Sequence, residues 1–276
     1  MPIAKLTDTK LFYDKCGSGS PFLVMHGGLG VDHSYFRPIF DSLGDIFQLI
    51  YYDHRGNGRS ESSEINKITF EQLADDANAL RETLGYEKIG IIGHSAGGFV
   101  ALHYALRHQE HLKYLILLDT SPAFDHMEEM MEIIQKRNPT TEIIATLNAP
   151  AASSEKEFKD QFKIIQPLYF SNYNNEVENL INKVIENMIM VPEVNLRSDE
   201  LIETYNVKPQ LKNIKIPTLI LVGKDDFICP PSQAQFMHNN IPNSELYIFE
   251  KSGHYVFYEE TDHFYRVIRN WFKKFK

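Results

Sequence analysis

Short hydrophobic segments recur along this chain, and nearly every position within each segment is apolar. Six such runs occupy residues 21–26, 46–53, 88–93, 112–119, 218–223 and 245–250. Strands of a parallel sheet that is covered on both faces have this uniform character, whereas a half-exposed strand alternates between apolar and polar positions. The runs therefore predict a mostly parallel central sheet.

The stretch between the second and third runs has a different period. Its apolar side chains recur at helical spacing, at Phe70, Leu73, Ala74, Ala77, Leu80 and Leu84. Thr69 is a good N-cap, because its side chain can accept a free amide hydrogen of the first turn, and Gly85 is a good C-terminal stop. Alternating strands and helices predict an α/β fold, with a doubly wound sheet flanked by helices.

The alternation stops between residues 122 and 210, where polar helix-like segments are separated by prolines and no run has strand quality. A structureless loop of that length is uncommon in a compact domain, and the functional loops of open α/β sheets lie at the carboxyl edge. We expect a helical cap, or lid, at residues 122–210. The core domain is then built from residues 1–121 and 211–276.

Composition narrows the classes of partner. The chain has 276 residues, of which 28 are basic and 37 acidic, for a formal net charge of −9. Because no basic run accompanies this charge, we expect no nucleic acid partner. A polar N-terminal segment and no run of about 18 apolar residues predict no secretion signal and no membrane span, hence a cytoplasmic protein acting on a small-molecule substrate. Cys16 and Cys229 are expected to be free thiols, and the oligomeric state stays open.

One segment, IGIIGHSAGGFVAL at residues 89–102, leads an apolar run directly into a serine among glycines. Gly93, Ser95 and Gly97 fit the pattern G-x-S-x-G between a predicted strand and a predicted helix, which is the context of a nucleophile elbow. Glycine permits the sharp turn that lifts the hydroxyl clear of its neighbours. The following helix directs amide groups at an anion formed there. We expect Ser95 to be a catalytic nucleophile.

A serine nucleophile needs a base, and a group that orients the base. His254 lies in EKSGHYVFYEE, directly after the last predicted strand and at a loop tip. His238 and His263 lie instead within helix-like stretches, where surface or packing roles are typical. We therefore expect His254 to be the base.

The orienting acid is expected between the serine and the histidine in chain order, at the end of a strand. The segment GKDDF offers Asp225 and Asp226, and Asp119 ends the earlier run LKYLILLD. The acid would accept the Nδ1 proton of the histidine and stabilise the imidazolium. The residues alone leave these three candidates open.

Acyl transfer also needs donors for the oxyanion. The segment MHGGLG, residues 25–30, follows an early strand, and its glycines let the backbone approach a bound carbonyl closely. We expect the backbone N–H groups of Gly28 and of Ala96, the residue after the nucleophile, to form the oxyanion hole. His26 is expected to have a structural hydrogen-bonding role.

Taken together, these motifs resemble the α/β-hydrolase fold family over nearly the whole chain. The segments on which the resemblance rests are HGG, DHRGNGRS, GHSAGG, GKDDFICP and SGH. GKDDFICP is similar to the family's acid loop G-x-x-D-x-x-x-P, which implies Asp226 as the acid of a triad with Ser95 and His254. HGGLGVDHSYF and YYDHRGNGRS resemble most the proline-iminopeptidase-like branch of serine peptidases, whose members have a helical cap. The resemblance implies a serine hydrolase.

Two positions depart from that branch. Proline iminopeptidases usually have an aromatic residue where this chain has Ala96, and often an acidic residue, which helps hold the substrate's free amino group, where it has Phe227. A carboxylate of the cap would have to hold that group instead. The candidates are Glu128, Glu132, Glu200 and Glu203. The departures favour a carboxylic ester or lactone as substrate over an N-terminal prolyl peptide.

Other activities share the same residues. A proline-iminopeptidase-like aminopeptidase, a carbon–carbon bond hydrolase and a catalytically silent binding protein stay as alternatives to the esterase or lactonase. The silent protein would need a broken triad or oxyanion hole, and every element is present in the sequence. No cofactor and no metal is expected, because the chain has no G-x-G-x-x-G after a strand, no phosphate-binding loop and no metal-ligand spacing.

Overall fold

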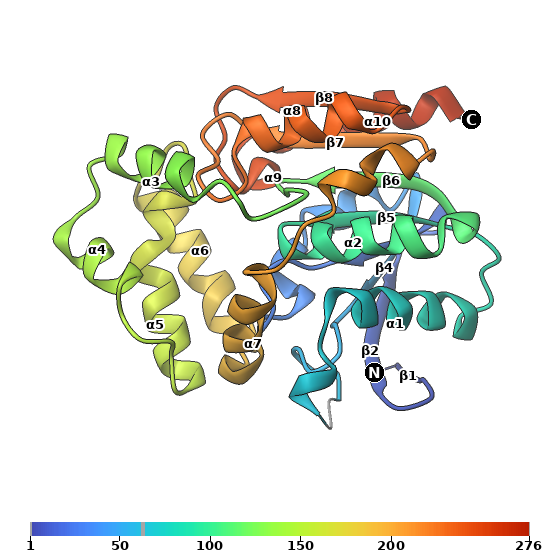
Figure 1. Cartoon of the computed structure of the whole chain (residues 1–276), viewed down its shortest axis with the longest axis horizontal. Coiled ribbons are helices and arrows are strands. Elements are labelled where there is room, and N and C mark those ends of the chain that lie inside the picture. Colours follow the sequence, from blue (N-terminus) through green and yellow to red (C-terminus); the bar gives the residue numbers. More distant parts are fainter. Residues whose placement is uncertain (1, 62–63, 276) are drawn as a thin grey trace.

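The central feature of the fold is one sheet, and the structure, a computed structural model, describes residues 2–61 and 64–275. Within these residues eight strands pair in the order β1-β2-β4-β3-β5-β6-β7-β8 (Figure 1). The strands are β1 (Ile3–Lys5), β2 (Lys10–Cys16), β3 (Ser20–Met25), β4 (Phe47–Tyr52), β5 (Ile89–His94), β6 (Leu112–Leu118), β7 (Thr218–Gly223) and β8 (Ser244–Phe249). β2 pairs antiparallel with β1 and with β4, and every other neighbouring pair is parallel. The predicted mostly parallel α/β sheet is confirmed.

The six predicted runs correspond to β3 to β8, with boundaries that agree to within about a residue or two. The sequence pattern missed β1 and β2. β1 has three residues, and β2 carries charged side chains along its length, so neither is a uniformly apolar run. Both lie at the antiparallel edge of the sheet, where a strand does not need two apolar faces.

Helices cover both faces of the sheet. α1 (Phe70–Thr83), α2 (Ala96–Arg107) and α8 (Pro231–Asn240) share one core cluster with one set of strand side chains. α10 (Thr261–Phe272) packs with the alternate strand side chains in a second cluster, which also contains aromatic residues of the segment 35–40. Because both faces are buried, the parallel strands must be apolar at almost every position, which is the pattern seen in the sequence.

The predicted helix after β4 forms as α1. The Thr69 side chain accepts a hydrogen bond from the backbone N–H of Gln72, and Gly85 has a φ of +78° just beyond the helix. A residue with a side chain rarely adopts that φ, which explains why glycine ends this helix. Both predicted helix boundaries are confirmed.

Residues 122–210, which we call the cap, contain five helices between β6 and β7. They are α3 (Met127–Lys136), α4 (Thr141–Leu147), α5 (Glu155–Ile165), α6 (Asn175–Asn187) and α7 (Pro192–Ile202). In Figure 1 they gather at the left, to one side of the sheet and its flanking helices. The helical character agrees with the sequence, while the division into a core and a cap at these residues stays a prediction. Residues 1, 62, 63 and 276 of the predicted core lie outside the described residues.

Two smaller predictions concern cysteine and membrane association. Cys16 and Cys229 are free thiols, as predicted. Among residues 2–61 and 64–275, no helix has the length and the apolar character that crossing a bilayer requires.

Candidate active site

Ser95 lies at a strained turn between β5 and α2. Its φ of +53° is unusual for a residue with a side chain, and such strain is typical of a nucleophile elbow. The turn is possible only because its neighbours are small. A Cβ on Gly97 would lie 2.2 Å from the carbonyl oxygen of Met25, and one on Gly93 would lie 2.6 Å from the carbonyl oxygen of Gly97. The glycines around Ser95 therefore serve close backbone packing.

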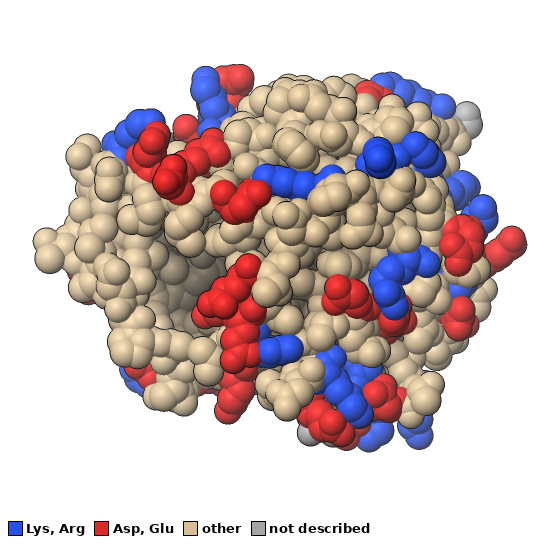
Figure 2. Space-filling model, viewed as in Figure 1, with Lys and Arg blue, Asp and Glu red and all other residues tan. Residues whose placement is uncertain are grey.

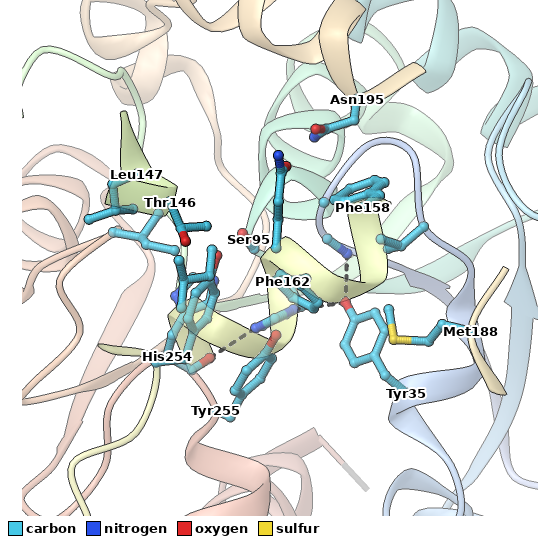
Figure 3. A pocket seen from close by; sticks show the side chains of 18 of the residues that line it. Tyr35, Ser95, Thr146, Leu147, Phe158, Phe162, Met188, Asn195, His254 and Tyr255 are labelled. Carbon is cyan, nitrogen blue, oxygen red and sulfur yellow. Dashed lines mark hydrogen bonds between the residues drawn. The ribbon is translucent and has the colours of Figure 1, made fainter. Parts of the chain in front are cut away.

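Ser95 opens into a cavity of about 380 Å³ between the cap and the sheet. Figure 2 shows a hollow in the surface beside the cap, with acidic side chains along part of its rim. The cap contributes Thr146, Leu147, Phe158, Gln161, Phe162, Ile165, Tyr169, Met188, Asn195 and Asp199 to the lining. The rest of the chain contributes Gly27, Gly28, Val31, Tyr35, His94, Ser95, Ile228, His254 and Tyr255 (Figure 3). The cap thus forms the wall that faces the serine.

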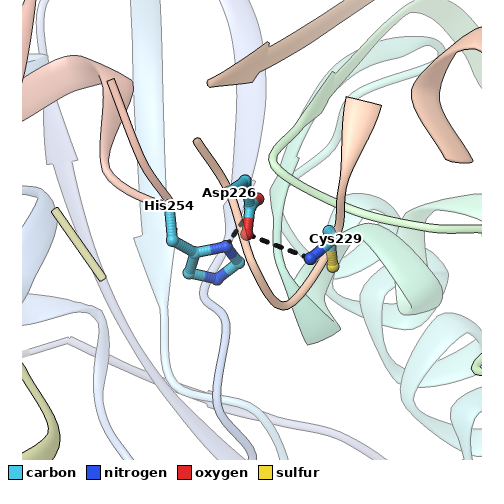
Figure 4. Close-up of side chains that lie close together, drawn as sticks. All are labelled: Asp226, Cys229 and His254. Carbon is cyan, nitrogen blue, oxygen red and sulfur yellow. Dashed lines mark hydrogen bonds and ion pairs between the residues drawn. The ribbon is translucent and has the colours of Figure 1, made fainter. Parts of the chain in front are cut away.

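His254 and Asp226 form a buried pair beside this cavity. His254 Nδ1 lies 2.8 Å from Asp226 Oδ2, and the side chains are 2% and 0% exposed (Figure 4). Asp226 Oδ1 accepts hydrogen bonds from the backbone N–H groups of Ile228 at 2.9 Å and Cys229 at 3.0 Å. The carboxylate is therefore held by three donors, one of them the imidazole. Ser95 and His254 both line the cavity, and no hydrogen bond joins their side chains.

The two other candidate acids have different surroundings. Asp225 is partly exposed and its carboxylate accepts a hydrogen bond from the hydroxyl of Ser171. Asp119 is fully buried, and its Oδ1 accepts the backbone N–H of Gly223 at 2.9 Å. Neither carboxylate is bonded to His254. Of the three aspartates, the structure brings only Asp226 to the histidine.

The expected oxyanion donors lie on either side of Ser95. Gly28 lines the cavity with a φ of +55°, and Ala96 is the first residue of α2, where backbone N–H groups have no partner within the helix. The N–H of Gly27 is bonded to the hydroxyl of Tyr35 at 2.6 Å, so this amide is already used. A Cβ on Gly27 would lie 2.7 Å from that of Ser95, so glycine is required where the two loops meet.

Comparison with known proteins agrees with this geometry. A family model described as alpha/beta hydrolase fold matches residues 20–261. The chain belongs to the alpha/beta hydrolase fold family. It is 29% identical over 280 residues to proline iminopeptidase PfmaB of Pestalotiopsis fici, with 98% of each chain covered.

Solved structures of the same family are similar over almost the whole hydrolase. An alpha/beta fold family hydrolase from Bacillus anthracis str. Sterne has a TM-score of 0.80 and 26% identity, with 98% of each chain covered. A thermophilic esterase from Thermogutta terrifontis has a TM-score of 0.75 and 26% identity, covering 96% of this chain and 94% of its own. The family match and these relatives show that the protein is a hydrolase, as the sequence predicted.

Three further histidines, His26, His238 and His263, have structural partners. His26 is fully buried, and its Nε2 accepts the backbone N–H of His54 at 3.1 Å. His238 is bonded to the hydroxyl of Ser244, and His263 to the hydroxyl of Tyr247. None of the three lines the cavity, in agreement with the packing roles expected for them.

The acidic residue at the cavity is not one that the sequence singled out. Glu128, Glu132, Glu200 and Glu203 are exposed and do not line the cavity. Asp199 does line it, one helical turn from Asn195 on the same side of α7. It is the only carboxylate among the lining residues that the structure describes, and it has no hydrogen bond or ion pair there. The sequence signal that could have indicated Asp199 is its spacing of four residues from Asn195, which places both side chains on one side of a helix.

Phe227 stands where proline iminopeptidases often have an acidic residue, and its side chain does not line the cavity. It is 4% exposed and packs with Ile134, Ile143 and Leu168 in a small core cluster beneath the cap. Its neighbour Ile228 lines the cavity instead. Phe227 therefore joins the cap to the acid loop and does not line the cavity.

Asp226, Cys229 and His254 also place one possible metal ligand each within 4.8 Å of one another. Both carboxylate oxygens already accept hydrogen bonds, as described above. Burial raises the pKa of the Cys229 thiol well above its usual value, and metals bind the thiolate. These contacts favour an acid–base pair beside a buried thiol over a metal site.

Proposed function

We propose that this hydrolase cleaves a carboxylic ester or lactone through an acyl-enzyme on Ser95, with His254 as base and Asp226 as the orienting acid. One observation carries the proposal. The hydrogen bond between His254 and Asp226 lies at the cavity into which Ser95 opens from a strained turn. A pair of this kind serves to take a proton from a neighbouring hydroxyl.

In the first half of the reaction, Ser95 Oγ attacks the carbonyl carbon while His254 Nε2 accepts its proton. The tetrahedral oxyanion is stabilised by the N–H groups of Gly28 and Ala96, each of which contributes about 10²–10³ in rate in comparable enzymes. Asp226 holds Nδ1–H and stabilises the imidazolium, which then gives its proton to the leaving alcohol. In the second half, His254 deprotonates a water that attacks the acyl-enzyme and releases the acid.

The lining of the cavity supports a neutral substrate. Apolar side chains from the cap, and one that follows the glycine segment 25–30, line the cavity into which Ser95 opens. They are Val31, Phe158, Phe162, Ile165 and Met188. An apolar acyl group gains about 25 cal/mol for each Å² of surface that it buries there. The likeness to the Thermogutta terrifontis esterase supports the same substrate class.

A fluorophosphonate probe tests the nucleophile. The parent protein should be labelled at Ser95 and should hydrolyse short-chain aryl esters. Ser95→Ala should lose both the labelling and at least about 10³ of the hydrolytic rate with unchanged circular dichroism, because no other hydroxyl among residues 2–61 and 64–275 has this arrangement. Parental labelling of Ser95→Ala would contradict the assignment, and an unlabelled parent would indicate a silent hydrolase-like protein.

A second candidate activity is release of an N-terminal proline or another amino acid. The likeness to proline iminopeptidase PfmaB and the carboxylate of Asp199 at the cavity support it. Partial burial raises the pKa of this carboxyl, and no cation is bonded to it. An α-ammonium could lie there, although the carboxylate is more solvated than a fully buried anchor. We therefore place this activity second.

Matched substrates decide between the two activities. A prolyl ester with a free imino group is compared with the same ester acylated on nitrogen, so that the leaving group is constant. We expect the neutral ester to have the higher kcat/KM. Should the free imino form be preferred, Asp199→Asn should reduce kcat/KM for that form about tenfold and leave the acylated form unchanged. Glu203→Gln, at the C-cap of the same helix and outside the cavity, is the control.

A further inference from the structure

Two loops of the site are joined by a chain of three hydrogen bonds through Tyr35 and His94. They are the oxyanion loop, residues 25–30, and the base loop, residues 251–255, which carries His254. The N–H of Gly27 donates to the Tyr35 hydroxyl at 2.6 Å. The hydroxyl lies 2.8 Å from His94 Nδ1, and His94 Nε2 lies 3.1 Å from the carbonyl oxygen of His254. The dashed lines in Figure 3 follow this path around Ser95. We call this set of contacts the Tyr35–His94 bridge.

We propose that Tyr35 and His94 are positioning residues that hold the oxyanion donors and the base at a fixed separation across Ser95. The proposal rests on the proposed function. Tyr35 follows the oxyanion loop in a short helix at His33–Phe36, and His94 is the last residue of β5, directly before the nucleophile. Three parts of the site that are far apart in the sequence thus meet in one hydrogen-bonded chain.

The geometry permits only one arrangement of protons in the bridge. The carbonyl oxygen of His254 can only accept, so His94 Nε2 must carry a hydrogen. Nδ1 of the neutral ring is then an acceptor, and the Tyr35 hydroxyl donates to it. The Tyr35 oxygen in turn accepts the hydrogen of Gly27. Every donor meets an acceptor, so the bridge is fully satisfied, and satisfied buried networks are rigid.

Burial keeps both residues in the required protonation state. Tyr35 is 5% exposed and His94 is 2% exposed. Burial raises the pKa of the Tyr35 hydroxyl well above its usual value, so it remains a donor. Burial and the neighbouring His254 hold the pKa of His94 well below its usual value, so this ring stays neutral. A neutral ring matters because the two imidazole centroids lie 5.0 Å apart, and a second cation there would oppose protonation of the base.

The bridge has a second anchor on the base loop. The backbone N–H of His254 donates to the carbonyl oxygen of Tyr169 in the cap at 2.7 Å. The peptide groups on both sides of His254 are therefore fixed, one by the cap and the other by His94. On the opposite side of Ser95, Gly27 is fixed by Tyr35 and by close packing against the serine. Loss of the Tyr35 hydroxyl would remove the hydrogen bond that holds the N–H of Gly27, and the adjacent Gly28 would be held less firmly.

Tyr35→Phe tests the bridge, because it removes one hydroxyl and keeps the ring that lines the cavity. We expect kcat for an aryl ester to fall about tenfold with KM changed by less than about twofold, the signature of a lost transition-state interaction. Tyr265→Phe is the control. Its hydroxyl is likewise hydrogen-bonded, donating to the backbone carbonyl of Ile39 at 2.7 Å, and it lies away from the cavity, so kcat should be unchanged.

A ¹⁵N spectrum of the histidine side chains tests the proton arrangement without catalysis. In the parent protein at neutral pH, His94 should be neutral with its proton on Nε2. A proton on Nδ1, or a parental kcat in Tyr35→Phe, would overturn the proposal. If the phosphonate fails to label the parent protein, the proposed function fails, while the tautomer of His94 still decides whether the bridge exists.

Discussion

Two buried aspartates lie near the base, and their surroundings differ. Asp226 accepts three hydrogen bonds, including one from His254. Asp119 has a φ of +44°, and its Oδ2 is buried without a partner. Burial and the nearby Asp226 raise the pKa of Asp119 well above its usual value, which favours the protonated form of this carboxyl. A protonated acid cannot stabilise an imidazolium as a carboxylate does.

Amide substitutions should separate the two aspartates. Asp226→Asn should lower kcat by about 10⁴, because the amide favours the wrong tautomer of His254. Asp119→Asn should leave kcat within about twofold of the parent, since an amide has nearly the shape of the protonated acid and can still accept the N–H of Gly223. Steady-state hydrolysis of an aryl ester measures both, and an inactive Asp119→Asn beside an active Asp226→Asn would reverse the roles.

The raised pKa of Asp119 also predicts a dependence of stability on pH. A group whose pKa is raised by folding contributes most below its unfolded pKa, and the contribution is lost as pH rises through the folded value. The melting temperature of the parent should therefore fall more than that of Asp119→Asn as pH rises from about 4, the unfolded pKa of an aspartate, into the alkaline range. Thermal unfolding of the two proteins across this range measures the difference, and parallel curves would show that Asp119 is not the titrating group.

At the scale of elements, the turn after β4 is fastened to α1 by a buried ion pair. Arg55 Nε and Nη2 donate to the two carboxylate oxygens of Asp76 at 2.7 and 2.6 Å, with the side chains 1% and 5% exposed. A similar two-pronged contact joins α2 to α1 at the surface, where Arg107 binds Asp75. The two pairs have the same chemistry and differ in burial, so they form a matched comparison.

Removal of the two arginines should have unequal effects. Arg55→Leu should lower the free energy of unfolding by about 3–5 kcal/mol, because Asp76 stays buried as an unpaired charge. Arg107→Leu should cost about 0–1 kcal/mol, because water solvates Asp75. Urea denaturation measures both values. Equal losses would mean that the buried pair is no more important than the exposed one.

At the scale of the whole molecule, the cap and the acid loop are tied together at Arg137. This residue follows α3 and donates to the carbonyl oxygens of Leu168 at 2.6 Å and Phe170 at 2.8 Å, and also to that of Asp225 beside the acid. Between these cap residues, Tyr169 accepts the N–H of His254. The Arg137 guanidinium therefore stabilises the segment 168–170, to which the loop of His254 is hydrogen-bonded.

Loss of this guanidinium should affect stability and rate together. Arg137→Met should lower the free energy of unfolding by about 1.5–3 kcal/mol, because three carbonyl groups lose a charged donor. It should also lower kcat, since the segment that holds His254 is loosened. Arg137→Lys should recover only part of both losses, because lysine lacks the planar fork of donors. Urea denaturation and ester hydrolysis measure these effects, and full recovery in Arg137→Lys would argue that charge alone suffices.

Much of the fold could be predicted because its signals are local. The parallel strands are apolar at nearly every position, and Thr69 and Gly85 mark the ends of α1. β1 and β2 were missed because a short or charged edge strand lacks that pattern. The site residues with local sequence signals could likewise be predicted. A glycine-bracketed serine and a histidine after the last strand were visible as sequence, whereas the cavity lining from the cap was not.

The sequence by itself determined strands β3 to β8 and the elbow at Ser95, because the backbone conformation at each depends on a few adjacent residues, and its motifs also indicated the family. The family resemblance already implied the pairing of Asp226 with His254, and only the tertiary structure decided which cap carboxylate reaches the cavity and that Tyr35 and His94 join two loops. These contacts link residues far apart in the chain. They depend on how helices and loops are oriented about the sheet, and side-chain spacing along one segment carries no information about that orientation.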